Sequence, residues 1–149
     1  MLIYLDNCCY NRPYDDQSLL SVSLETQAKL YVQELIRRGR LQMVNSYMLE
    51  FENSENPYEL RRQAIGVFIS ENESKYVSID RERDVIRLAE KIMATGVKYK
   101  DACHVACAVL SGCEYFLTTD HRLLKYNSDK IRMVDPVAFV KILEEKQDE

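Results

Sequence analysis

The sequence contains little glycine and little proline, and it lacks any long uncharged apolar run. Its 149 residues include four Gly and three Pro, while 46% are hydrophobic and 30% are charged. This composition excludes collagenous, repeat-built and intrinsically disordered proteins. No apolar run approaches the ~18 residues that a membrane span needs, and Asp6 brings a charge too early for a signal peptide. We therefore expect one globular domain over residues 1–149, soluble, cytoplasmic and without membrane contact.

An excess of positive charge is also absent. Twenty Lys and Arg stand against 24 Asp and Glu, which gives a net charge of −4 at pH 7. This balance argues against broad electrostatic attraction to nucleic acid. Any role with nucleic acid must therefore rest on a local site or on a bound cation.

The cysteines do not form a recognisable disulfide or zinc pattern. Their number, five, is odd, and no export signal precedes them, so free thiols in a reducing compartment are expected. Cys103, Cys107 and His104, with the Cys8-Cys9 pair, do not have the C-x₂₋₄-C spacing of structural zinc sites. Small buried thiols that pack the core are the favoured interpretation.

Apolar runs of strand length alternate with segments of helical periodicity. This alternation predicts an α/β fold with three layers, α/β/α, around a central and mostly parallel sheet. The segment 99–111 is so apolar that its helix should be central and buried, and residues 6–17 should form a polar loop. The expected strands are 1–5, 41–44, 75–79, 114–119 and 131–134; the expected helices are 18–38, a short one around 47–51, 58–69, 81–95 after an N-cap at Asp80, 99–111, and 136–145.

Acidic residues follow the strands at the edge of the sheet where ligands bind in α/β proteins. Asp6 and Asp120 end the first and fourth strands, and Asp101 begins the apolar helix. Glu50 or Glu52, in the helix after the second strand, supplies a further acid. Such carboxylates repel one another unless a cation lies between them. All-oxygen ligands suit Mg²⁺ or Mn²⁺, and such a centre can activate water to attack a phosphodiester.

Three blocks of the sequence resemble the PIN domains, a family that includes the VapC-type toxins of toxin-antitoxin systems. Residues 3–7 (IYLDN) resemble its first strand and first acid, residues 100–108 (KDACHVACA) its third-acid helix, and residues 116–120 (FLTTD) its final strand with a Thr-x-Asp motif. The resemblance spans the whole chain. It implies a metal-dependent endoribonuclease that hydrolyses RNA, and it makes an antitoxin partner and a homodimer reasonable expectations.

The second acid remains open between two glutamates. PIN domains often carry it about six residues after a Ser at the end of the second strand, and counting from Ser46 selects Glu52. Glu50 stays an alternative, because residues two apart point to different sides of a helix and only one can face a pocket directly. The predicted metal ligands and catalytic residues are therefore Asp6, Glu52, Asp101 and Asp120, hereafter the four acids.

Other residues near the four acids are secondary candidates. Asn7 follows the first acid, and the hydroxyl of Thr118 has the chemistry to orient a phosphate or a water. His104 lies one turn after Asp101, although a hydrogen-bonded histidine at the edge of the core is the favoured interpretation. Positive contacts for RNA are candidates at Arg12, Arg122 and Lys125.

Two other classes of function remain as alternatives. One is a non-catalytic interaction module with a PIN-like fold, against which the complete acid set argues. The other is a phosphoryl-transfer domain with a nucleophilic Asp. Asp6-Asn7 lacks the Asp-x-Asp spacing common in phosphatases of that type.

Overall fold

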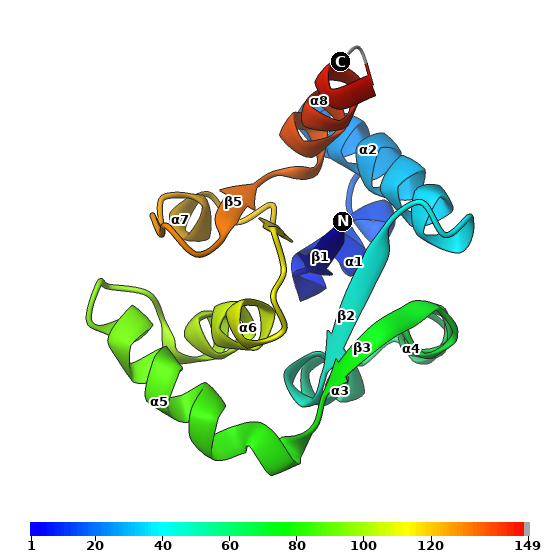
Figure 1. Ribbon diagram of the computed structural model, residues 1–149. Helices are drawn as coiled ribbons and strands as arrows, with labels where there is room; N and C mark the ends of the chain where they lie inside the picture. Colours follow the sequence, from blue (N-terminus) through cyan, green and yellow to red (C-terminus); the bar gives the residue numbers. More distant parts are fainter. Residues whose placement is uncertain (148–149) are drawn as a thin grey trace.

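The computed structural model describes residues 1–147, in which five short strands are joined by helices (Figure 1). The elements are β1 (Leu2–Leu5), α1 (Asn7–Asn11), η1 (Arg12–Tyr14), α2 (Leu20–Arg37), β2 (Gln42–Ser46), α3 (Tyr47–Ser54), α4 (Glu59–Asn72), β3 (Glu73–Val77), η2 (Ile79–Arg81), α5 (Glu82–Met93), α6 (Tyr99–Leu110), β4 (Tyr115–Leu117), α7 (His121–Leu124), β5 (Arg132–Val134) and α8 (Pro136–Gln147).

The five strands form one sheet in the order β3-β2-β1-β4-β5, and every neighbouring pair is parallel. The strand β1 is central, and its residues Ile3 to Leu5 are completely buried. A strand covered on both faces must be apolar throughout, which explains the continuous run LIYL at the start of the chain. The predicted parallel sheet is confirmed.

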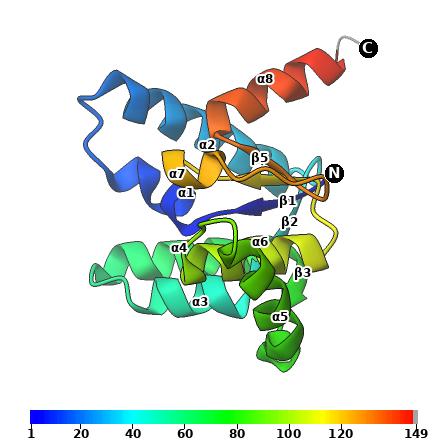
Figure 2. The same cartoon turned by 90° about the vertical axis from the view of Figure 1, so that its left-hand side faces the viewer.

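Helices cover both faces of the sheet, so the predicted three layers are also confirmed (Figure 2). The helices α2 and α8 lie together on one side. The helices α3, α4, α5 and α6 lie on the other. No helix within the described residues is long and apolar enough to cross a membrane.

The helix α6 is the most deeply buried helix of this second layer, as its composition predicts. Every residue from Ala102 to Ala108 is buried. The small Ala and Cys side chains let its backbone approach the sheet closely, and the aromatic ring of Tyr4 on β1 stacks on that of Phe116 at 5.2 Å. The N-terminal turn of α6 is thereby held beside the ends of β1 and β4.

Two short helices replace segments that sequence reasoning left as loops. Residues 7–11 form α1 because the carboxylate of Asp6 caps it, accepting a hydrogen bond from the backbone N–H of Asn7 at 2.8 Å. Asp120 caps α7 in the same way through the N–H groups of Arg122 and Leu123. The acids expected to act in chemistry also start helices.

Two predicted boundaries around the third strand were wrong. The strand β3 begins at Glu73 and ends at Val77, two residues before the expected 75–79, and runs directly from the end of α4. Asp80 does not cap a helix. It lies within η2, which Ser78 caps through its hydroxyl, and α5 starts at Glu82.

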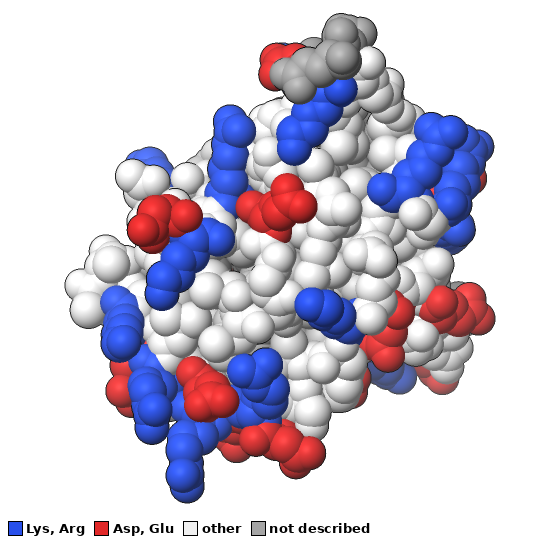
Figure 3. All heavy atoms as spheres, viewed as in Figure 1, with Lys and Arg blue, Asp and Glu red and all other residues white. Residues whose placement is uncertain are grey.

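Charged side chains are interspersed over the face viewed in Figure 1, where the N-terminus lies. Basic and acidic groups lie mostly toward its edges, near one another, around a largely uncharged centre (Figure 3). This distribution agrees with the net charge of −4. In open parallel sheets ligands bind beyond the carboxyl ends of the strands, so that edge of the sheet is the place to look for a site.

Candidate active site

The order of strands reverses between β1 and β4, and this switch point forms the centre of the candidate site. In the register of the sheet Leu5 lies opposite Leu117, so the chain leaves both strands at the same level. The N–H of Asp6 donates to the carbonyl of Leu117 at 2.9 Å. In open parallel sheets, the crevice beyond such a reversal is the usual binding position.

A cavity of about 370 Å³ opens at this edge, and we call it the acidic pocket. The four acids all line it, although they come from the ends of two strands and from two helices. Asn7, Cys8, Asn11 and Asp15 complete its wall. Glu50 does not line the pocket; it is exposed, and it accepts a hydrogen bond from Asn45 at 3.3 Å.

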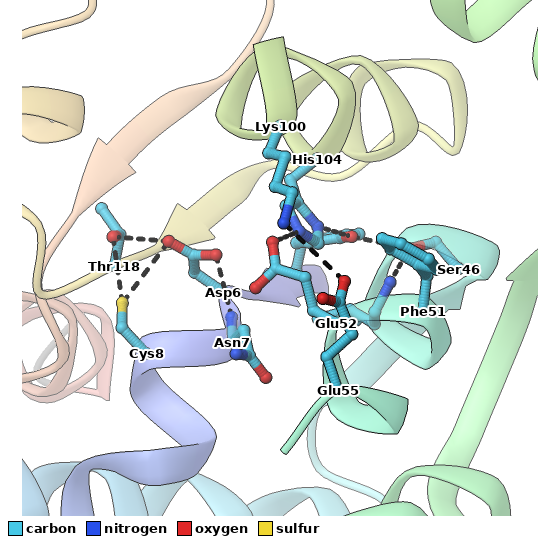
Figure 4. Close-up of polar contacts among 12 residues, drawn as sticks. Asp6, Asn7, Cys8, Ser46, Phe51, Glu52, Glu55, Lys100, His104 and Thr118 are labelled. Carbon is cyan, nitrogen blue, oxygen red and sulfur yellow. Dashed lines mark hydrogen bonds and ion pairs between the residues drawn. The ribbon is translucent and has the colours of Figure 1, made fainter. Parts of the chain in front are cut away.

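Asp6 is the most enclosed of the four acids, with 6% of its surface exposed. One carboxylate oxygen accepts hydrogen bonds from the hydroxyl of Thr118 (2.9 Å) and the thiol of Cys8 (3.4 Å), and the other caps α1 (Figure 4). Burial raises the pKa of Asp6, while the charge of His104 and the bond from Thr118 oppose this rise. The carboxylate is therefore firmly oriented but poorly solvated.

Asp101 and Asp120 add charge to the pocket. One oxygen of Asp120, Oδ1, accepts the capping N–H groups of α7. Asp101, in the first turn of α6, has no hydrogen-bond donor among the described residues. Burial, followed by the charges of Asp6 and Asp120, raises the pKa of Asp101 to about 6. Burial is the largest cause of this rise, and repulsion from the neighbouring carboxylates adds to it.

Glu52 is held by a chain of buried side chains that leads away from the pocket (Figure 4). Its Oε1 lies 2.6 Å from Nε2 of His104, and Nδ1 of the same ring lies 2.6 Å from the hydroxyl of Tyr4. That hydroxyl lies 2.7 Å from Ser46, whose oxygen also accepts the N–H of Leu49 as the cap of α3. The helix that carries Glu52 and the side chain itself are thus tied to β1 and α6.

These hydrogen bonds satisfy both ring nitrogens of His104, whether the ring is neutral or charged. The hydroxyl groups of Tyr4 and Ser46 can reverse direction, so Nδ1 either donates to Tyr4 or accepts from it. Burial lowers the pKa of His104, but the hydrogen bond to Glu52 and the charges of Asp6 and Glu52 outweigh it, and the net pKa is raised. Conversely, burial raises the pKa of Glu52, and His104 more than reverses this. The pair favours a charged Glu52.

The secondary candidates take different positions. Asn7 lines the acidic pocket, whereas Thr118 and His104 stand behind it and contact Asp6 and Glu52, respectively. Arg12 is not a free cation, because its guanidinium pairs with Asp15 (3.0 Å) and Glu25 (2.8 Å).

Sequence reasoning missed three residues of the pocket wall: Cys8, Asn11 and Asp15. A helix at residues 7–11 would have been the signal for Asn11, since Asn7 and Asn11 are one turn apart on one face. For Cys8, the signal is its place on that same helix. No sequence pattern near Asp15 identifies it as a residue of the pocket. It lies directly after η1, and the turn of the backbone there brings it to the wall.

The acidic pocket has the donor chemistry for a hard divalent cation. Carboxylate oxygens dominate its wall, as Mg²⁺ and Mn²⁺ prefer. Burial and the neighbouring carboxylates raise the pKa of Asp101, and a cation would oppose both effects. Within residues 1–147, no three Asp, Glu, His or Cys side chains already converge as a ligand group.

In sequence, the chain matches no protein-family model and no curated protein. In structure, it is similar to VapBC2 from Rickettsia felis, solved bound to a DNA fragment from their promoter, with a TM-score of 0.54 and 12% identity over 89% of this chain and 97% of the other. It is also similar to FitAcB from Neisseria gonorrhoeae, with a TM-score of 0.55 and 12% identity over 90% and 97%. At this identity the likeness establishes the fold, which is the PIN-like α/β fold that the sequence resemblance implied.

Proposed function

We propose that this protein is a metal-dependent endoribonuclease that hydrolyses RNA phosphodiester bonds, with Mg²⁺ or Mn²⁺ held by the four acids. The observation that carries the proposal is the common cavity: four carboxylates from four separate elements line it at the switch point of the sheet. Helix capping accounts for Asp6 and Asp120, but it gives no reason to place Asp101, which has no donor among the described residues, beside them. The PIN-like fold supports the same function.

The side chains behind the pocket have defined tasks in this proposal. Thr118 and the N–H of Asn7 orient the two oxygens of Asp6, and His104 orients Glu52. Asp101, with a pKa near 6, is ionised for the most part at neutral pH and becomes more so beside a cation. A divalent cation bound there would supply Lewis-acid activation of a water and of the phosphodiester.

Cleavage of labelled RNA tests the proposal directly. A 5′-labelled single-stranded RNA is incubated with the protein and millimolar Mn²⁺ or Mg²⁺, with EDTA, and with the Asp101→Asn variant. We expect internal cleavage that requires the cation and that falls below detection in the variant, because the amide keeps the shape but removes a charge that anchors the cation. The variant should stay folded by circular dichroism.

The alternatives predict different results in the same experiment. A non-catalytic module leaves the RNA intact at every metal concentration. A phosphoryl-transfer domain leaves it intact as well but takes label from a radioactive phosphoryl donor. Cleavage that persists at wild-type rate in Asp101→Asn would show a contaminating nuclease or a different active site, and would contradict the proposal.

We further propose an antitoxin partner encoded beside this protein. The support is the likeness to VapBC2, whose name matches the VapC-type toxins that the sequence resembles. A small open reading frame adjacent to the gene is the expected observation, and its product should co-purify with the protein and suppress RNA cleavage. A homodimer is a related expectation, which light scattering on the purified protein tests.

A further inference from the structure

A second cavity adjoins the acidic pocket and differs from it in charge. It measures about 600 Å³, and we call it the side pocket. Its wall consists of residues 95–98 between α5 and α6, and of Arg122, Leu123 and residues 125–127 in and after α7. Asp101 and Asp120 line both cavities, so the two are continuous across these carboxylates.

The side pocket carries three cations, Lys98, Arg122 and Lys125, whose side chains are exposed. Within the described part of the chain none of them forms an ion pair. Arg12, in contrast, is paired twice. Unpaired cations around a concave surface are the usual means of holding phosphate groups.

The remaining wall has the character of a site for a flat ring. Tyr126 and Val97 are half-buried and pack against the core, and Leu123 is buried beneath them. Asn127 adds a hydrogen-bonding amide to the wall. The hydroxyl of Thr95 donates to the carbonyl of Ile92 at 2.7 Å and offers a ligand only its acceptor capacity. A volume of about 600 Å³ lies within the range of small-ligand sites, and it combines apolar surface with a few polar groups, as such sites do.

We propose that the side pocket binds the unpaired nucleotide next to the scissile phosphate of single-stranded RNA. Tyr126 stacks on the base, and Arg122 and Lys125 contact the neighbouring phosphates. This inference rests on the proposed nuclease function, and it specifies the substrate as a strand whose base has left its helix. A base stacked and paired within a duplex cannot enter a concave pocket, whereas an exposed base stacks on an aromatic ring readily.

Binding experiments separate this inference from the nuclease activity. All proteins carry Asp101→Asn, so that the RNA stays intact, and the probe is a fluorescent hexaribonucleotide measured by anisotropy from low to high salt in Mg²⁺. Arg122→Gln and Lys125→Gln should each weaken binding and flatten the slope of log affinity against log salt by about 0.7, as the loss of one phosphate contact on a single strand requires. The matched control is Lys141→Gln, an exposed lysine on α8 outside both pockets, which should match its parent.

The aromatic contact gives a different signature. Tyr126→Leu should weaken binding about tenfold with no change in the salt slope, because stacking carries no net charge. Tyr126→Phe keeps the ring and should bind like its parent. The thermal midpoint of each variant shows whether the fold survives; should Tyr126→Leu unfold, the two exposed cation variants decide the question alone.

The outcomes distinguish the two proposals. Unchanged affinity and slope in Arg122→Gln and Lys125→Gln, or equal affinity for the hexamer in a duplex, would overturn the side pocket while leaving the nuclease proposal standing. A third outcome is that binding depends on Arg122 and Lys125 but the wild-type protein never cleaves RNA. That outcome would support the side pocket and reject the nuclease proposal. Absence of any binding to single-stranded RNA in wild-type and Asp101→Asn protein overturns the side pocket, and absence of cleavage in addition overturns both.

Discussion

The acids at the strand ends and the acids on helices are held in different ways. Asp6 and Asp120 each have one oxygen held by backbone N–H groups one to three residues away, which cap α1 and α7. The other oxygen of Asp6 accepts from the thiol of Cys8 and from the hydroxyl of Thr118, 112 residues away. Glu52 depends on His104, 52 residues further along the chain, and Asp101 has no donor among the described residues. Local structure alone therefore orients Asp120, local and distant donors together orient Asp6, and packing places Glu52 and Asp101.

This difference makes the helix acids the sensitive part of the site. A capped carboxylate keeps its place when distant contacts change, because its donors belong to the same turn. Glu52 keeps its place only while α3, α6 and β1 remain in register. Substitutions far from the acidic pocket should therefore affect Glu52 more than Asp120, whose donors all lie within three residues.

The largest loss of cleavage in this comparison is expected when Glu52 is substituted and Glu50 is left intact. Glu52→Gln should lower single-turnover cleavage by about 100-fold or more, the scale for losing a group that anchors the cation. Glu50→Gln is the matched control and should cost little, because Glu50 lies outside the pocket. Rates are measured on one RNA at saturating Mn²⁺. A loss confined to Glu50→Gln would move the second acid by two residues.

Substitution of His104, which holds Glu52 from behind, should cause a smaller loss of cleavage. His104→Leu removes the contact to Glu52 and should reduce cleavage or Mn²⁺ affinity by about 10- to 100-fold, as is typical of residues that orient a metal ligand. His104→Gln keeps a donor and should recover part of the loss, and higher Mn²⁺ should recover more. The alternative result is a His104→Leu variant that depends on Mn²⁺ as the wild type does and loses cleavage only in proportion to its unfolded fraction. That result would show that His104 serves stability alone.

Binding of the cation should also raise the free energy of unfolding. At about 100 times its dissociation constant, Mn²⁺ adds ~2.7 kcal/mol to the free energy of unfolding, a rise in midpoint of roughly 5–10 °C for a chain of this size. Thermal unfolding with and without Mn²⁺ measures it. Asp6→Asn should reduce the rise strongly, and Glu50→Gln should not; equal rises in all three proteins would place the ion elsewhere.

The smallest effect concerns the pH dependence of stability without metal. Asp101 has a pKa of about 6 in the folded protein and about 3.9 when unfolded, so the folded state binds the proton more tightly. The stability that this proton confers is complete below pH ~4 and is lost as the pH rises to about 6. In EDTA, the stability of Asp101→Asn relative to the wild type should therefore increase between pH ~4 and about 6. Above that range its higher stability should stay constant. A constant difference in stability at every pH would show that the pKa of Asp101 is not raised in the folded protein.

Much of this arrangement follows from patterns that are local in sequence. The run LIYL before Asp6, the run before Asp120 and the apolar segment that follows Asp101 predicted the parallel sheet, the buried helix and three of the pocket acids. Such patterns are readable because burial on both faces demands continuous apolar residues, and because parallel strands end at one edge. The resemblance to PIN domains rests on the same blocks.

Only the tertiary structure decided what depends on distant partners. It separated Glu52 from Glu50, because the direction of a side chain around a helix is set by packing rather than by spacing from Ser46. It joined His104 to Tyr4 and Glu52 across 100 and 52 residues, withdrew Arg12 into ion pairs, and placed Lys98 in the same cavity as Arg122 and Lys125. The sequence by itself determined which groups stand at the strand ends; which other groups meet them depends on how the helices pack across the sheet, and no local pattern encodes that.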